Sequence, residues 1–467
     1  MKIYNTLTRQ KEELVPLEPG VVRIYACGPT VYNFIHIGNA RPLCVFDVLR
    51  RYLEWRGYEV KFVQNFTDID DKIIRRANEE GVGYQEIAAR YIEEFWVDAK
   101  GLGVREATVH PKATENMEEI ESLIAGLVEK GYAYRAANGD VYFRTHKFDE
   151  YGKLSHQPLD DLEAGARIDV SELKEDPMDF ALWKAAKPGE PSWPSPWSEG
   201  RPGWHIECSA MSTTYLGDTF DIHGGGKDLL FPHHENEIAQ ATGATGKPFV
   251  HYWMHNGFLN IDNEKMSKSK GNFFTVRDIA KEFDLEAVRM FTLSAHYRSP
   301  LNFSREQIAQ AQSSLERLYT ARDQLKFLLS GAKDREPNET EKAFMDACTA
   351  SKEHFIAAMD DDLNTADALS SIFELVREVF KLDASDVSRK AVEFGQETFL
   401  GMTDVLGLLM KKDDGIDPEV QKLVEERAEA RKNKDWKRSD ELRDQIKAMG
   451  YILEDTAAGQ KVRKSGV

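Results

Sequence analysis

The first 130 residues alternate between short apolar runs and longer amphipathic stretches. Residues 21–27 form an apolar run ended by Gly28 and Pro29, which is typical of a buried strand. A helical pattern follows over residues 40–55, stops at Gly57, and is succeeded by a second strand-like run over residues 60–67. Strand, glycine turn, helix and strand in this order predict the beginning of a nucleotide-binding α/β layer.

The pattern changes between residues 131 and 202. An Asn138-Gly139 pair between two strand-like runs predicts a β-hairpin. Residues 187–203 are rich in Pro, Ser and Trp, a composition that disfavours both helix and central strand. We interpret this region as an insertion, because the α/β pattern resumes after it with expected strands at 220–223 and 250–255 and a hairpin at 258–265.

Beyond residue 271 the apolar spacing is helical almost throughout, interrupted by a polar linker at 411–418. The predicted fold class is therefore α/β: a split Rossmann-like domain with a parallel sheet and an insertion, followed by an all-α C-terminal half.

The composition limits the classes of protein that the chain can belong to. With 467 residues, 41% hydrophobic and 30% charged, it is typical of a globular protein of several domains. No apolar run approaches the roughly 20 residues of a membrane span, and no secretory signal follows Met1. The 4 cysteines, Cys27, Cys44, Cys208 and Cys348, are too widely spaced for a disulfide framework and indicate a reducing compartment. We therefore expect a cytoplasmic protein without a membrane partner.

The charge distribution along the chain is uneven. The net charge of -18 argues against indiscriminate binding to nucleic acid. Residues 427–467, however, contain 11 Lys and Arg against 7 Asp and Glu, a local excess of 4 positive charges. Such an asymmetry indicates either a polyanionic partner at this end or a solvated helical face.

A candidate metal site lies after the glycine-rich turn at 223–227. Pro232 suits the first turn of a helix, so His233 and Glu237 would leave the same helical face one turn apart. A histidine and a carboxylate with this spacing can share one metal ion, with further ligands to come from the cysteines. The alternative is a helix with a polar face and a capping pair of histidines.

Two short segments are suited to binding a polyphosphate. His36-Ile-Gly-Asn39 lies at a predicted loop-to-helix junction, where Gly38 allows close approach and free N–H groups can meet phosphate oxygens. Lys265-Met-Ser-Lys-Ser269 places lysines and hydroxyls on a glycine-ended loop that could close over the phosphates. Each signal alone is weak, but the two in this order, about one nucleotide-binding domain apart, are strong together.

With these segments the sequence closely resembles the class I aminoacyl-tRNA synthetases, whose signatures are written HIGH and KMSKS, and within that class the cysteinyl-tRNA synthetases. The resemblance spans nearly the whole chain. The matching segments are residues 27–32, 36–39, 66–72, 203–211, 231–239 and 265–269. One position departs from the pattern, because Asn39 stands where the class signature has a second histidine. An asparagine can still donate a hydrogen bond to phosphate, so only that contact is affected.

The resemblance implies a zinc site whose ligands are Cys27, Cys208, His233 and Glu237. These are ordinary zinc donors, and zinc prefers thiolate to hydroxyl, so the sulfur of a substrate cysteine can bind the metal directly. Shape alone would separate Cys from Ser or Ala by only about 1–3 kcal/mol of binding free energy, the limit of a pocket that senses a small group, but a metal–thiolate bond can exceed that. We therefore predict no editing domain. A structural zinc closed by four protein ligands is the alternative. His234 is expected to orient a ligand, and Cys44 and Cys348 are expected to be core residues.

The resemblance also implies roles for the remaining site residues. The expected catalytic residues are His36, Asn39, Lys265 and Lys268, and Gly38 and Ser267 complete the expected ATP site. The expected cysteine-binding residues are Thr67, Trp204 and His223. The expected anticodon contacts are Arg431, Trp436 and Asp440, although a solvated amphipathic helix would explain them as well.

The implied activity is a cysteine–tRNA ligase that joins L-cysteine to tRNA(Cys) with ATP and Mg²⁺ and acts as a monomer. A ligase that joins cysteine to an amino-sugar, and a zinc or thiol sensor that binds tRNA, are the alternatives. The expected domains are 1–130 and 203–270 (the two catalytic halves), 131–202 (the insertion), 271–315 (a stem-contact region), 316–410 (a tRNA-binding bundle) and 411–467 (an anticodon domain).

Overall fold

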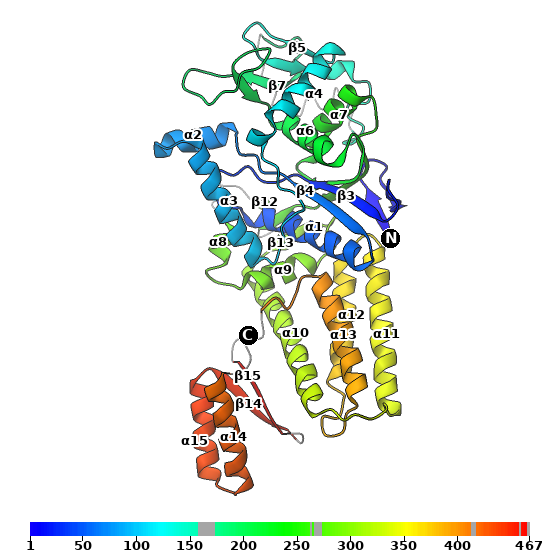
Figure 1. Ribbon diagram of the computed structural model, residues 1–467, viewed down its shortest axis with the longest axis vertical. Helices are drawn as coiled ribbons and strands as arrows, with labels where there is room; N and C mark the ends of the chain where they lie inside the picture. Colours follow the sequence, from blue (N-terminus) through cyan, green and yellow to red (C-terminus); the bar gives the residue numbers. More distant parts are fainter. Residues whose placement is uncertain (157–172, 262–263, 266–272, 412–416, 457–458, 465–467) are drawn as a thin grey trace. The chain divides into compact units, whose positions relative to one another are not determined.

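The computed structural model describes residues 1–156, 173–261, 264–265, 273–411, 417–456 and 459–464. The chain folds as two compact units (Figure 1). The first contains Met1–Arg305 and Asp360–Asn364, and the second contains Glu306–Met359 and Thr365–Val467. None of the helices in the described ranges has both the length and the apolarity needed to span a bilayer.

A four-stranded parallel sheet forms the centre of the first unit, as the alternating pattern predicts. Its strands, in spatial order, are β10 (Val250–Asn256), β9 (Phe220–Gly226), β3 (Val21–Ala26) and β4 (Glu59–Gln64). The chain steps from β3 to β4 on one side and from β9 to β10 on the other, so the strand order reverses between β3 and β9. Open α/β sheets bind their ligands at such a reversal, beyond the carboxyl ends of the strands.

Helices cover both faces of this sheet. The helices of the first unit are α1 (Ile37–Trp55), α2 (Asp71–Glu80), α3 (Tyr84–Gly101), α4 (Met117–Glu129), α6 (Trp204–Leu216), α7 (Glu235–Thr245), α8 (Val276–Ile279) and α9 (Leu285–Leu293). On one face, Tyr25 and Trp253 pack in an apolar cluster with Cys208 of α6. Strand side chains alternate, so Gly224 turns to the other face, where an added Cβ would lie 2.1 Å from the ring of Phe46 on α1. Glycine is required there because α1 lies so close.

The insertion forms a second, antiparallel sheet, which packs with α4, α6 and α7 around its own apolar core. Its strands are β5 (Ala133–Arg135), β6 (Val141–Phe143), β7 (Phe180–Ala185) and β8 (Gly200–Pro202). The β5–β6 hairpin turns at the predicted Asn138-Gly139 pair, and Gly139 adopts a positive φ of 94°. Two further small sheets belong to the same unit: β1 (Lys2–Asn5) with β2 (Gln10–Glu13), and β12 (Glu264–Lys265) with β11 (Leu259–Ile261) and β13 (Leu301–Phe303).

The second unit is mostly helical, which confirms the predicted C-terminal half. Its helices are α10 (Arg305–Gly331), α11 (Glu339–Asp360), α12 (Thr365–Val379), α13 (Arg389–Val405), α14 (Pro418–Lys432) and α15 (Trp436–Ala448), the outermost residues of α10 and α11 belonging to the first unit. One element that the helical pattern did not predict is the hairpin of β14 (Tyr451–Thr456) and β15 (Gly459–Lys464), which follows Gly450 and packs Tyr451 against α14 and α15 residues.

Candidate active site

A cavity of about 460 Å³ opens at the strand-order reversal between β3 and β9. One end is lined by Cys27, Thr67, Trp204, Cys208 and His233, and the other by His36, Gly38, Asn39, Phe273 and residues 256–259. The cavity therefore joins the two groups of residues that the sequence singled out separately. Its volume falls in the range of small-molecule sites.

The first signature segment caps helix α1. His36 is the N-cap residue, and its backbone N–H donates to the Asn39 Oδ1 at 3.1 Å. The Asn39 N–H returns a bond to the His36 carbonyl at 2.8 Å. Asn39 therefore fixes the helix end with its amide oxygen. This arrangement shows how asparagine can serve at the one position that departs from the class signature.

The second signature segment lies largely outside the described residues. Ser267 and Lys268 are outside them, and of Lys265 only the backbone, in β12, is described. The chain that follows the lysine-rich segment returns to the first signature segment. Thr275 forms an antiparallel bridge with His36, and the Ile37 N–H donates to the Phe274 carbonyl at 3.1 Å. The backbone thus attaches the exit of the lysine-rich segment to the start of α1.

Four elements converge at the other end of the cavity. Cys27 follows β3, Cys208 lies on α6, His233 lies in the turn before α7, and Glu237 lies on α7. Their donor atoms all lie within 4.8 Å of one another. The two sulfurs are 3.8 Å apart, and His233 Nε2 is 3.0 Å from Glu237 Oε1. Two thiols, an imidazole and a carboxylate that converge in this way fit a tetrahedral zinc ion.

The helix that carries Glu237 begins later than the sequence predicted. Helix α7 starts at Glu235, and residues Leu230–His234 form a single wide turn that precedes it. Phe231 is extended (φ -136°, ψ 134°), because the residue before a proline avoids the helical region. The bond between Phe231 and Pro232 is cis. His233 and Glu237 nevertheless meet as expected, since the chain is helical from His233 onward.

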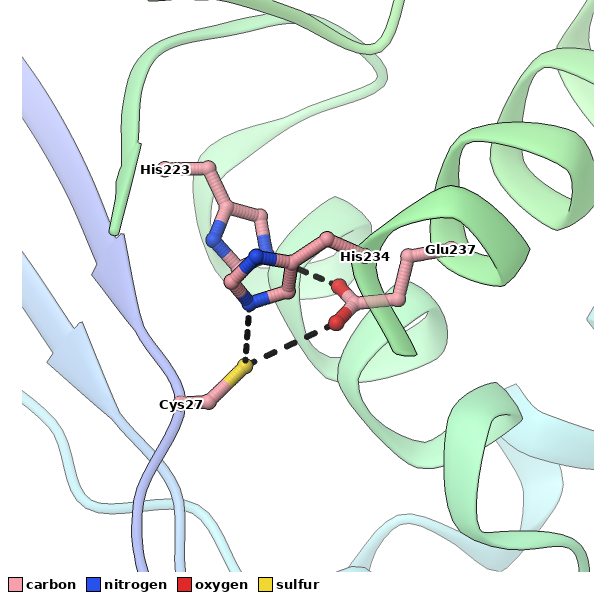
Figure 2. A group of neighbouring side chains, drawn as sticks. All are labelled: Cys27, His223, His234 and Glu237. Atoms are coloured by element: carbon pink, nitrogen blue, oxygen red, sulfur yellow. Dashed lines mark hydrogen bonds and ion pairs between the residues drawn. The ribbon is translucent and has the colours of Figure 1, made fainter. Parts of the chain in front are cut away.

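A second group of possible ligands overlaps the first. Cys27, His223, His234 and Glu237 also bring their donor atoms within 4.8 Å of one another (Figure 2). His234 Nε2 lies 3.4 Å from the Cys27 sulfur, and His223 Nε2 lies 2.8 Å from Glu237 Oε2. Neither His223 nor His234 lines the cavity, whereas Cys27, Cys208 and His233 all do. The first group therefore places three of its four residues at the cavity, whereas the second places only Cys27 there.

Charges in this buried cluster are strongly coupled. Burial opposes the ionisation of Glu237, but the adjacent His223 and His233 lower the pKa of its carboxyl to about 2. Burial likewise opposes the charged form of His233, and Glu237 and Cys208 raise its pKa to about 10. The neighbouring Cys27 thiol lowers the pKa of Cys208 to about 6, while burial raises the pKa of Cys27 itself. A carboxylate on Glu237 and a thiolate on Cys208 are thus stabilised by a positive charge on His233, and a metal cation bound there would take the place of the imidazole proton.

Outer histidines hold the inner ligands in place. His205 Nδ1 lies 2.9 Å from His233 Nδ1, and His255 Nε2 lies 2.8 Å from His234 Nδ1. His255 Nδ1 in turn lies 2.9 Å from Thr6 Oγ1. Burial lowers the pKa of both outer histidines, that of His255 to about 3. Sequence reasoning missed both residues. The available signal for His205 was its position three residues before Cys208 on the same helix.

The expected amino-acid pocket residues are placed differently from one another. Trp204 is 41% exposed and its ring centroid lies 4.5 Å from that of His233, with the two planes tilted by 33°, and Thr67 donates to the buried Glu207 at 3.0 Å. Both line the cavity. His223 is fully buried, stacks on Trp253 and does not line the cavity, so it contacts Glu237 rather than the space that a substrate would occupy.

The three residues expected to contact an anticodon lie on or beside α15. Trp436, at its first position, is 58% exposed, and the Arg431 guanidinium lies 5.9 Å from its ring centroid. The Asp440 carboxylate is exposed and lies 3.9 Å from Arg443. Arg431, Arg443 and the buried Arg427 all contact Asp455 of the β14–β15 hairpin, at 2.8–3.2 Å. The Trp436 ring is therefore exposed to solvent beside a group of arginines that Asp455 holds in place.

Family models match nearly the whole chain. A model described as the catalytic domain of tRNA synthetases class I (C) matches residues 13–313. A DALR domain matches residues 354–410, and a cysteinyl-tRNA ligase anticodon binding domain matches residues 413–463.

Similar proteins carry a consistent description. A cysteine–tRNA ligase of Clostridioides difficile (strain 630) is 57% identical over 99% of this chain and 100% of its own length. A cysteine–tRNA ligase of Anoxybacillus flavithermus (strain DSM 21510 / WK1) is 53% identical over 99% of each chain.

Solved structures share the fold at low identity. Methionyl-tRNA synthetase of Mycobacterium tuberculosis with methionyl-adenylate has a TM-score of 0.61 at 16% identity, covering 83% of this chain and 89% of its own. A leucyl enzyme, agnB2 LeuRS of Agrobacterium radiobacter K84 in a ternary complex, has a TM-score of 0.60 at 12% identity, covering 85% of each chain. These two matches support the predicted fold class.

Proposed function

The chain belongs to the cysteine–tRNA ligase family of class I tRNA synthetases, and from that premise we propose how its residues divide the reaction. The enzyme activates L-cysteine with ATP to cysteinyl-adenylate and pyrophosphate, and then transfers the cysteinyl group to the terminal adenosine of tRNA(Cys). The observation that carries the proposal is a single cavity with a sulfur-seeking cluster at one end and a capped helix N-terminus at the other.

At the first end, Cys27, Cys208, His233 and Glu237 would hold a zinc ion. When bound, zinc would supply a Lewis acid that prefers the thiolate of the substrate to the hydroxyl of serine. His205 and His223 hold His233 and Glu237 by hydrogen bonds, and His234 contacts Cys27. Trp204 and Thr67 face the cavity beside the cluster and would contact the remainder of the amino acid.

At the other end, the N-terminus of α1 receives the phosphates. Gly38 gives access to the backbone N–H groups, and His36 and Asn39 supply side-chain donors. A carboxylate oxygen of the cysteine attacks the α-phosphorus of ATP, and the bond between the α-phosphorus and the β,γ-pyrophosphate breaks. Lys265, Ser267 and Lys268 stabilise the charge on the departing pyrophosphate, with Mg²⁺ bound to the ATP. A ribose hydroxyl of the tRNA then attacks the cysteinyl carbonyl, and AMP leaves.

We propose a role in catalysis or in tRNA binding for each region of the chain. Residues 1–130 and 203–270 form the catalytic halves, 131–202 the insertion, 271–315 a stem-contact region, 316–410 a tRNA-binding bundle and 411–467 the anticodon domain. The enzyme acts as a monomer in the cytoplasm. A ligase that joins cysteine to an amino-sugar has no use for an anticodon domain, and the match over residues 413–463 favours tRNA over that alternative.

Two assays test the proposal. Cysteine-dependent exchange of pyrophosphate into ATP separates an enzyme from a zinc or thiol sensor, and charging of tRNA separates the two ligases. Lys268→Ala is expected to slow adenylate formation by about a hundredfold, the loss typical of one transition-state donor, while the chain still binds cysteine. Loss of cysteine binding in this variant would contradict the division of roles.

A further inference from the structure

A buried arginine connects the phosphate-binding helix to the opposite wall of the cavity. Arg41 lies on α1 two residues after Asn39, and its side chain is 0% exposed. Its Nη1 donates to the Gly257 carbonyl at 2.8 Å and to the Phe258 carbonyl at 3.1 Å, and its Nη2 donates to the His296 carbonyl at 3.1 Å. The guanidinium thus donates hydrogen bonds to two separate backbone segments, at residues 257–258 and at His296.

The charge of Arg41 is compensated in an unusual way. Its contacts are carbonyl oxygens, and within the described ranges no carboxylate lies in ion-pair contact with it, while its Nε has no acceptor. Burial lowers its pKa to about 10, so the guanidinium remains charged near neutrality. A buried cation held by neutral dipoles alone destabilises the fold relative to an apolar side chain. This cost suggests that Arg41 serves a purpose besides core packing.

Residues 257–258, to which Arg41 donates, belong to the wall at the nucleotide end of the cavity. Residues 256–259 all line the cavity, and Phe258 is a 38% exposed aromatic that could stack on a base. The backbone there is tightly placed: the Gly257 N–H donates to the Tyr297 carbonyl at 2.8 Å, and an added Cβ on Gly257 would lie 2.5 Å from the Ser299 carbonyl oxygen. The segment then continues into β11, which pairs with the strand that contains Lys265.

We propose that Arg41 is a positioning residue for ATP: it fixes the distance between the helix N-terminus that holds the phosphates and the wall, residues 256–259, that faces the nucleoside. This inference rests on the proposed function, because it assigns that part of the cavity to ATP. Arg41 does not line the cavity and acts only through the backbone that it holds. It therefore affects ATP and not cysteine, whose expected contacts lie at the other end.

The test compares Arg41→Lys and Arg41→Gln with Arg289→Lys in the full-length zinc-loaded protein. Arg289 is a matched control, since it is equally buried in the same unit but donates to Asp47 at 2.6 Å and to the Leu102 carbonyl at 3.1 Å, away from the cavity. Exchange of pyrophosphate gives the two KM values, and equilibrium dialysis with labelled ATP measures binding without cysteine. Zinc content and thermal unfolding report the folded state.

We expect both Arg41 variants to raise the KM and the dialysis Kd for ATP by about tenfold, the effect of losing a charged hydrogen bond, with the KM for cysteine unchanged. Arg289→Lys should lower the unfolding temperature and change neither constant. The inference is overturned if ATP and cysteine weaken together in the Arg41 variants, if ATP binding is unaffected, or if Arg289→Lys gives the same selective loss.

Two further measurements keep these outcomes separate from folding and from the proposed function. If Arg41 variants do not fold, Gly257→Ala displaces the same wall from its other side and should weaken ATP selectively; equal weakening of both substrates would overturn the inference. If the wild-type chain shows no exchange, the proposed function fails. Equilibrium dialysis would still test the role of Arg41 in ATP binding, because it does not depend on the exchange reaction.

Discussion

The buried cluster of thiols, histidines and Glu237 beside the cavity and the exposed helix α15 are built in opposite ways. Cys208, His233 and Glu237 are at most 2% exposed, and each is held by further side chains from other elements. Trp436 is 58% exposed, and Asp440 projects into solvent on the same short helix. The first region is assembled from three stretches of the chain, at residues 27, 208 and 233–237, whereas the second is displayed by one segment.

This difference determines how each region should respond to substitution. In the cluster Cys208, His233 and Glu237 are buried and share their contacts, so removing one leaves charges that a neighbour cannot compensate. On α15 each contact adds a modest amount, and water replaces whatever is lost. We therefore expect large, all-or-none effects at the cluster and graded effects on the helix.

The largest effect is expected for Cys208→Ser. A serine hydroxyl is a poor zinc ligand, so we expect the bound zinc to be lost and cysteine-dependent exchange to fall by about a hundredfold or more, at least the loss seen for residues that support a metal ligand. Metal analysis and the exchange assay measure the two quantities. Cys348→Ser is the control, because Cys348 is equally buried on α11 but lies outside the cluster. Full zinc occupancy in the Cys208→Ser variant would contradict the expectation that a substitution in the buried cluster has a larger effect than one on α15.

An intermediate effect is expected for Trp436→Ala. Stacking of one base on an aromatic ring contributes about 1–3 kcal/mol, so kcat/KM for tRNA charging should fall by about tenfold while pyrophosphate exchange is unchanged. Steady-state charging with tRNA(Cys) transcript measures the first quantity. Met449→Ala, a 37% exposed apolar residue at the opposite end of the helix, should leave both activities intact. A parallel fall in exchange would show that the residue is not specific to tRNA.

The smallest effect is expected from acid. Hydrogen bonds and charge from Arg427, assisted by Arg431 and Arg443, lower the pKa of Asp455. A carboxyl whose pKa is lower in the folded state stabilises the fold fully above its unfolded pKa of about 3.9, and that contribution is lost as the pH falls through the folded value. Amide hydrogen exchange of α14 and α15 should therefore accelerate below about pH 4. Asp455 is partly exposed, so the effect is modest, and Asp455→Asn should abolish this pH dependence. An unchanged acid profile in the variant would assign the effect to other groups.

Several features could be predicted from the sequence because they depend on local spacing. Apolar periodicity separated the strand-and-helix half from the helical half, and the Asn138-Gly139 pair located a hairpin. The position of His36 and Asn39 at a helix N-terminus followed from a loop that enters a helix. The terminal hairpin after Gly450 was missed because its residues are polar and alternate only weakly, and its packing against α14 and α15 stabilises it.

The sequence by itself determined the family, the fold class and the types of donor atom available for a metal. Only the tertiary structure decided which donors meet in the cavity. His223 and His234 are as suitable for zinc as His233 by residue type, yet they lie behind Glu237 and Cys27, away from the cavity. The outer contacts of His205 and His255, and the grip of Arg41 on residues 257–258, join segments that lie far apart in the chain. Spacing along a chain fixes what lies on one helix or strand, but contacts between elements depend on how the whole sheet and its helices pack.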